Sequence, residues 1–497
     1  MATDTYSRSV SRQRRAGVLL HPTSLPGLSD NGDLGHNAFH FIDFMHAAGL
    51  GIWQMLPHGP THDDGSPYQG LSVHAGNPMW ISLDPLIASR WIYPIETDAA
   101  KGNPTLRKEQ LQLAHRGFEY GASNEDREEY SHFRKQNAWW LDDYAMFVAL
   151  REENGHRAWL DWPEGERNRH KDALKQAHTR LTSAIEQVCF EQFLFFRQWH
   201  ALKSYANEKG VRLFGDLPIY VALDSADVWV SRKQFDLDKN GQPRSVAGVP
   251  PDYFSETGQR WGNPLFAWKT MQQDGFSWWQ TRIRSALELY DLVRIDHFRG
   301  FEAYWSIPAA SETAINGEWI KAPGEQLFNA LHEAFGKLPL VAEDLGVITE
   351  EVTDLRRQFG IPGMRILQFA FDGTGKNPYL PHNHETDSVV YTGTHDNNTT
   401  AAWFDELDHD EKQNVLDYLG HPSEPMPWPL IRSALASVAD AAIIPMQDLL
   451  GLGAGHRMNT PGTTKGNWQW RFDWRQVPDN LADRLKHLLH IYGRAPN

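Results

Sequence analysis

Carboxylates, an arginine and a histidine follow short apolar runs at several places in this chain. Arg294 and Asp296 stand two positions apart, Glu343 ends a later run, and His395 and Asp396 end another. Residues two apart on a strand share a face. Arg294 can therefore lie beside Asp296 and keep it ionised at neutral pH, as a nucleophile requires.

A pair of carboxyl groups around one bond is suited to glycoside chemistry. One carboxylate attacks the anomeric carbon, and the other group, as an acid, protonates the leaving oxygen. Where the two stand about 5–5.5 Å apart, the reaction retains configuration through a covalent glycosyl-enzyme. We expect Asp296 and Glu343 to have this spacing. The alternative is that each acid only caps a strand end or forms an ion pair, but three acids on alternate strand ends favour the catalytic interpretation.

The apolar runs that precede these residues predict the fold. They are nearly continuous, as in parallel strands that are buried on both faces, rather than alternating. Helix-like segments follow several of them, for example residues 38–48 and 349–358. Strand–helix units of this kind predict a (β/α)8 barrel, with its chemistry at the C-terminal ends of the strands. The predicted strands are residues 17–21, 51–57, 211–221, 292–298, 340–346, 364–371, 389–397 and 441–450.

The predicted barrel occupies only part of the chain, so the rest is expected to be insertions. We predict a disordered segment over residues 1–16 and a single catalytic barrel over 17–497. Charged helical stretches predict a helical subdomain at about 70–205. Residues 222–291 include a Pro/Gly-rich segment and predict a loop without regular structure that covers the substrate.

Composition excludes several classes of protein. The chain has 497 residues, of which 41% are hydrophobic and 22% charged, an ordinary globular mixture. The formal net charge of 48 − 63 = −15 disfavours broad nucleic-acid binding. No apolar run is long enough for a membrane helix. Cys189 is the only cysteine, so no internal disulfide and no cysteine-built zinc site can form, and a cytoplasmic location is expected.

The first residues do not predict a secretion signal, because no apolar segment follows the arginines. A short organelle transit segment is the alternative. The chain also has 20 Trp, 15 Tyr and 24 Phe, which suit both core packing and stacking on sugar rings. The aromatic residues around Cys189, from Phe190 to Trp199, predict a buried helix.

Longer motifs resemble those of one enzyme family. The segments LLHPTSLPG (19–27), SPYQ (66–69), FGDLPIYV (214–221), GVPPDYFSETGQRWGNPLFAW (248–268), RIDHFRGFEAYW (294–305), VAEDLG (341–346), YTGTHDNNT (391–399) and NTPGTTKGNW (459–468) resemble the amylomaltases. These are the 4-α-glucanotransferases, or disproportionating enzymes, of glycoside hydrolase family 77. The resemblance runs from about Gly17 to Trp474.

The resemblance implies a retaining transferase that cleaves an α-1,4-glucan and passes the held piece to the 4-hydroxyl of another glucan. It implies that Asp296 is the nucleophile, Glu343 the general acid/base, and Asp396 the carboxylate that favours the distorted sugar. The implied substrate-binding residues are Ser66, Tyr68, Asp216, Gln259, Trp261, Arg294, Asp372, His395 and Asn467. Asp344 is expected to be structural, and Asp448 to cap a helix.

No cofactor and no metal are expected, because no phosphate-binding loop occurs in the right context and the histidine pairs lack a third ligand. The expected partners are α-1,4-glucans and malto-oligosaccharides, with no nucleic acid and no membrane, and the chain is expected to be a monomer or a homodimer. Two alternatives remain. One is an α-glucan hydrolase on the same barrel, and the other is a catalytically silent glucan-binding protein.

Overall fold

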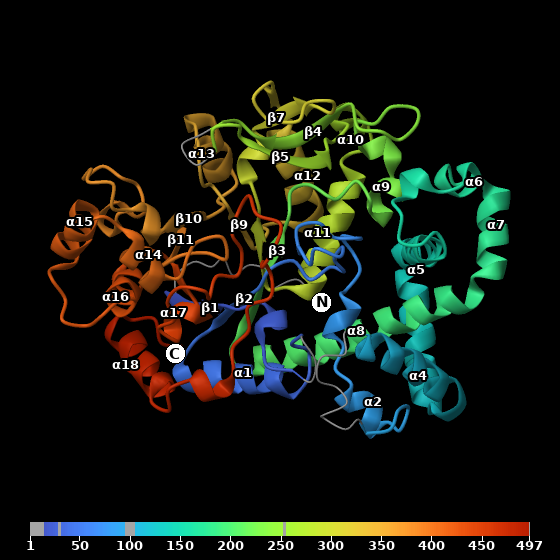
Figure 1. Cartoon of the computed structure of the whole chain (residues 1–497), viewed down its shortest axis with the longest axis horizontal. Coiled ribbons are helices and arrows are strands. Elements are labelled where there is room, and N and C mark those ends of the chain that lie inside the picture. The colour runs from blue at the N-terminus through green and yellow to red at the C-terminus, as the bar shows by residue number, and fades with distance from the viewer. Residues whose placement is uncertain (1–13, 28–30, 95–104, 252–254, 497) are drawn as a thin grey trace.

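The computed structural model describes residues 14–27, 31–94, 105–251 and 255–496 (Figure 1). Its centre is a sheet of eight strands in which every neighbouring pair is parallel. The strands are β1 (Arg15–Leu19), β2 (Ile52–Gln54), β3 (Arg212–Leu217), β6 (Leu292–Ile295), β9 (Leu340–Ala342), β10 (Gly363–Ile366), β11 (Ser388–Tyr391) and β12 (Ala441–Pro445). All eight predicted strands are confirmed.

The order of these strands is β10-β11-β12-β1-β2-β3-β6-β9. The two edges meet, because the backbone N–H of Ala342 in β9 donates to the carbonyl of Pro362, which precedes β10, at 2.8 Å. The predicted (β/α)8 barrel is therefore confirmed. β1 begins at Arg15, two residues before the predicted start of the barrel, and residues 1–13 of the predicted disordered segment lie outside the described residues.

The strands are shorter than the apolar runs that predicted them. β6 ends at Ile295 and β9 ends at Ala342, so Asp296 and Glu343 are the first residues beyond their strands. The barrel hydrogen bonds continue past these ends. The N–H of Asp296 donates to Leu217 O at 3.0 Å, and the N–H of Glu343 donates to Ile295 O at 2.9 Å. Both acids are thus held by the barrel backbone.

Helices follow most of the strands. α1 (His36–Ala48) ends at Gly49, whose φ of 74° is the left-handed conformation that glycine adopts freely, and α13 (Glu350–Gln358) follows β9. Between β10 and β11 the chain has only the short 3-10 turns Leu367–Phe369 and Pro381–Asn383. The remaining helices of the barrel wall are α12 (Gly324–Phe335), α14 (Thr400–Glu406), α15 (His409–Leu419), α16 (Trp428–Ala436), α17 (Met446–Leu449) and α18 (Leu481–Ile491).

The connection from β2 to β3 is helical in its described part. Figure 1 shows most of these helices beside the barrel, where the long α5 and α8 pack against each other. Cys189 and its aromatic neighbours in α8 are buried, as predicted. The helices are α2 (Asp84–Ala88), α4 (Leu106–Gly121), α5 (Asn124–Glu153), α6 (Glu164–Arg167), α7 (Lys171–Arg180) and α8 (Thr182–Glu208).

The prediction of an irregular loop over residues 222–291 was wrong. This segment contains α9 (Ala226–Val230), α10 (Trp268–Gln273), α11 (Ser277–Leu289) and two strands, β4 (Ser245–Val249) and β5 (Gln259–Pro264). β4 and β5 form an antiparallel sheet with β7 (Ala303–Pro308) and β8 (Glu318–Lys321), in the order β5-β4-β7-β8. β4 and β5 pair with each other, but the other partner of β4 is β7, which lies beyond β6 in sequence, and the local Pro/Gly content concealed the strands.

Candidate active site

An ion-pair network joins the ends of β3 and β6. Both oxygens of Asp216 accept hydrogen bonds from Nη1 of Arg294, at 2.8 and 2.6 Å. Nη2 of the same arginine lies 3.1 Å from Oδ1 of Asp296. The Tyr68 hydroxyl donates to Asp216 Oδ2 at 2.7 Å. Arg294 therefore lies beside Asp296, as their spacing predicted, and it also pairs with Asp216, which the spacing did not predict.

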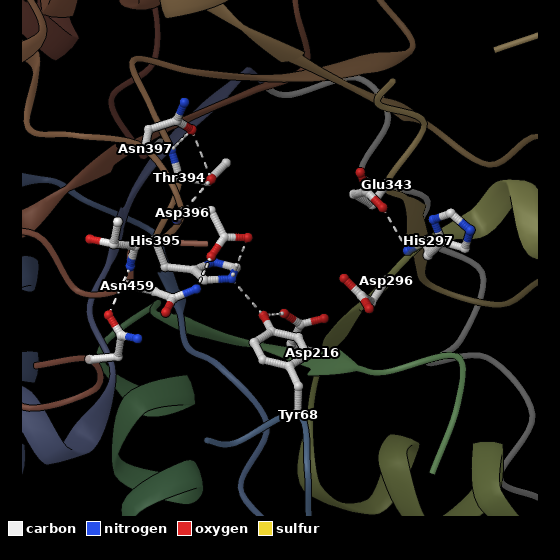
Figure 2. A network of polar contacts seen from close by, with 12 residues as sticks. Tyr68, Asp216, Asp296, His297, Glu343, Thr394, His395, Asp396, Asn397 and Asn459 are labelled. Atoms are coloured by element: carbon white, nitrogen blue, oxygen red, sulfur yellow. Dashed lines mark hydrogen bonds and ion pairs between the residues drawn. The ribbon is translucent and has the colours of Figure 1, made fainter. Parts of the chain in front are cut away.

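Glu343 is positioned by the backbone that follows β6. The N–H of His297 donates to Glu343 Oε2 at 2.6 Å (Figure 2). His297 has a φ of 48°, in the left-handed region that few residues other than glycine adopt. Uncommon backbone conformations of this kind cluster at functional sites.

Burial dominates the protonation of the two acids. It raises the pKa of Asp296 to about 7 and that of Glu343 to about 8, while the nearby Arg294 acts in the opposite direction on both. Arg294 thus favours the ionised form of Asp296, in the direction expected, while removal from water acts against it.

A second cluster lies across the site at the end of β11. His395 Nε2 lies 3.3 Å from Asp396 Oδ2 and 3.0 Å from the Tyr68 hydroxyl. The rings of Tyr68 and His395 stack, with centroids 5.3 Å apart. The Asn459 side-chain amide donates to Asp396 Oδ1 at 2.6 Å. Figure 2 shows this cluster facing Asp296 and Glu343 across the site.

Two predicted substrate-binding residues reach the site from β5. The indole N–H of Trp261 donates to Gln259 Oε1 at 3.1 Å, and the Trp261 ring meets the His297 ring edge to face at 4.8 Å. The half-buried Trp261 therefore touches the residue that holds Glu343. Two further aromatic residues of the predicted covering loop, Tyr253 and Phe254, lie outside the described residues.

Three predicted substrate-binding residues are not joined to this network by any hydrogen bond of the described chain. The N–H of Ser66 donates to Asp64. Asp372 is exposed and holds a turn through Thr374. The amide of Asn467 closes its own loop. Their contact with substrate stays a prediction.

Two other acids at strand ends have structural roles, as predicted. Asp344 is paired with Arg356 at 3.2 Å and accepts from the N–H of Met364 at 2.7 Å. Asp448 accepts from the N–H of Thr400, the first residue of α14, at 2.8 Å, and thus caps that helix. Neither carboxylate is free for catalysis.

Sequence reasoning missed the roles of His297, Asn459 and Trp468. Trp468 lies 5.9 Å from the Tyr68 ring and 6.1 Å from the His395 ring. All three residues lie in motifs that the sequence analysis singled out. Those motifs do not show which side chain or N–H group contacts the carboxylates in the folded chain.

Among residues 14–27, 31–94, 105–251 and 255–496, no group of three or more His, Cys, Asp and Glu side chains is arranged to hold a metal ion. No helix in this part of the chain is long and apolar enough to cross a membrane. The barrel, the half-buried acid pair and the surrounding polar and aromatic groups together define the class of glycoside-processing barrel enzymes.

The comparisons with known proteins specify the family. The 4-alpha-glucanotransferase model of glycoside hydrolase family 77 matches residues 20–476. The 4-alpha-glucanotransferase of Thermus thermophilus is 49% identical over 97% of this chain and 99% of its own length. The one from Synechocystis is 47% identical over 97% of this chain and 98% of its own length. The amylomaltase from Streptococcus agalactiae, solved in complex with acarbose, superposes with a TM-score of 0.93 at 38% identity, over 97% of this chain and all of its own. The chain belongs to the 4-α-glucanotransferase family.

Proposed function

We propose that this protein is a retaining 4-α-glucanotransferase that acts on α-1,4-glucans and malto-oligosaccharides. The observation that carries the proposal is the half-buried pair of Asp296 and Glu343 on adjacent strand ends, in a chain of this family. Two carboxyl groups that titrate one after the other can share the roles of nucleophile and acid.

The position of Arg294 assigns these roles. Its guanidinium lies 3.1 Å from Oδ1 of Asp296 and favours the ionised form, so Asp296 is the group that attacks the anomeric carbon. Burial raises the pKa of Glu343, which can therefore keep its proton for the leaving glycosidic oxygen. The bond between the two sugars breaks, and the donor piece is held as an ester of Asp296.

The second half of the reaction reverses these steps. Glu343, now ionised, takes the proton of an incoming 4-hydroxyl, the oxygen attacks the anomeric carbon, and Asp296 is released. Asp396 and His395 are positioned to bind hydroxyls of the reacting sugar, and the Tyr68 ring to stack on its face. Trp261 from β5 and Trp468 from the opposite side are suited to covering the acceptor and limiting access of water.

Incubation with maltotriose tests the proposal. Transfer gives products longer than maltotriose together with glucose or maltose, and thin-layer chromatography separates them. Glucose and maltose without longer sugars would identify the hydrolase instead. No new sugar at all would favour the silent binding protein, although three intact carboxylates argue against it.

We further propose a cytoplasmic location, supported by a single buried cysteine that requires no oxidising compartment. The Arabidopsis thaliana relative is named as chloroplastic or amyloplastic, and cell fractionation distinguishes the two. A monomeric or homodimeric state is also proposed, and sedimentation equilibrium measures it.

A further inference from the structure

An open pocket of about 230 Å³ lies between α5, α9 and α11, and none of the catalytic acids lines it. Trp139 and Trp140 line it from α5, and Ser277 and Thr281 from α11. Ser72, which follows Tyr68 by four residues, closes one side. Nothing in the proposed reaction uses these residues.

Trp139 is unusual among the tryptophans of this chain. It is 52% exposed, while most of the others are buried in the core. Its ring is held in place, because it meets the His74 ring edge to face at 4.9 Å. A fixed aromatic face that is open to solvent can stack on a ligand at little cost in conformational entropy.

The pocket also carries neutral polar side chains, because Gln234, Ser277 and Thr281 line it. Nε2 of Gln234 donates to Asp274 at 2.7 Å, which fixes that side chain. The hydroxyl groups of Ser277 and Thr281 can form hydrogen bonds with the hydroxyls of a ligand.

The charges in the pocket favour a neutral ligand. Asp143 is paired with Arg169 at 2.6 Å, and Asp227 accepts from the N–H of Val73 at 3.0 Å. These carboxylates repel an anion such as a phosphate. Because both are already paired with donors of the protein, they attract a cation only weakly. An aromatic face beside neutral polar groups suits a sugar.

The pocket adjoins the catalytic site through one short segment. Ser72 lines this pocket and also the separate one that contains Tyr68 and Asp216. We propose that the pocket around Trp139 and Gln234 binds a segment of α-1,4-glucan chain, as a second site that holds long substrates near the catalytic acids. This inference rests on the proposed function for the identity of the sugar. A glucan chain that is bound at this second site has a higher effective concentration at the catalytic site.

Kinetics with a short and a long donor test the proposal. Trp139→Ala should raise the KM for amylopectin about tenfold, the loss expected for one aromatic stacking contact, and leave maltotriose transfer unchanged. Trp139→Phe, which keeps an aromatic face, should restore most of the loss. Tyr120→Ala, at a 90% exposed aromatic residue of α4, is the matched control and should behave as the wild type.

Direct binding gives a second measurement. In an Asp296→Asn background, retardation of the protein in native gels that contain amylopectin should fall when Trp139→Ala is added. An unchanged retardation in Trp139→Ala, or an equal fall in retardation with Tyr120→Ala, would overturn the proposal. A loss of maltotriose transfer in Trp139→Ala as large as the loss with amylopectin would also overturn it. Failure of the wild type to transfer maltotriose would instead count against the proposed function.

Discussion

The backbone N–H of His297 donates to Oε2 of Glu343 at 2.6 Å, which ties the turn after β6 to the acid after β9. Asp296 immediately precedes His297, so one short turn carries the proposed nucleophile and also holds the proposed acid. His297 itself has a left-handed φ of 48°. A main-chain hydrogen bond therefore helps to set the position of the Glu343 carboxyl group relative to Asp296.

The pH dependence of kcat/KM should be bell-shaped. The active form needs Asp296 ionised and Glu343 protonated, so activity should fall below about pH 7 as Asp296 gains a proton and above about pH 8 as Glu343 loses one. The two apparent pKa values belong to the coupled pair. Rates with maltotriose over a wide pH range measure both limbs, and a profile that stays flat through this range contradicts the assignment.

Asp296→Asn should abolish transfer, because the amide cannot form the covalent glycosyl-enzyme. The protein should remain folded, since the replacement has nearly the same shape. Product analysis with maltotriose and a thermal melt measure the two effects. Transfer at the wild-type rate would show that another group is the nucleophile.

Glu343→Gln should lower the rate with maltotriose by about 10²–10⁴, as is typical when a general acid/base is lost. With a glucosyl fluoride donor, whose leaving group needs little protonation, the first step should still proceed and the glycosyl-enzyme should accumulate. Mass spectrometry of the intact protein detects the attached sugar. Its appearance on a residue other than Asp296 would contradict the mechanism.

Two substitutions of Tyr68 distinguish the effect of its hydrogen bonds from the effect of its ring stacking on the sugar. Tyr68→Phe loses the bonds to Asp216 and His395 and keeps the ring, and it should reduce kcat about tenfold or more. Tyr68→Ala also loses the stacking surface and should raise KM in addition. If the two variants have equal KM values for maltotriose, the ring does not contact the sugar.

Trp261→Ala should raise the fraction of glycosyl-enzyme that is lost to water, because the ring beside His297 is expected to cover the acceptor side of the site. The measurement is the ratio of reducing ends released to transfer events at a fixed maltotriose concentration. A lower rate with an unchanged ratio would mean that Trp261 only supports the loop and that other groups exclude water.

Local sequence was sufficient for the barrel and for most of the acid positions. Parallel strands that are buried on both faces require nearly continuous apolar runs, so β3 and β9 could be predicted from such runs alone. The polar residues that end each run were then expected to lie at the barrel mouth. The structural role of Asp344 was predicted correctly for a different reason, because neighbouring residues on a strand point to opposite faces and Asp344 adjoins Glu343.

Tertiary structure decided what depends on partners distant in sequence. β4 and β5 pair within a sheet whose other strands lie beyond β6, and no local pattern in a Pro/Gly-rich segment encodes that pairing. Burial outweighs the ion pair with Arg294 and raises the pKa of Asp296, an effect of surroundings that spacing alone cannot supply. Asn459 reaches Asp396, 63 positions away, only because the chain returns across the barrel mouth. The sequence by itself determined which residue types stand at the strand ends, and the fold decided their distances and protonation, because both depend on what packs around them.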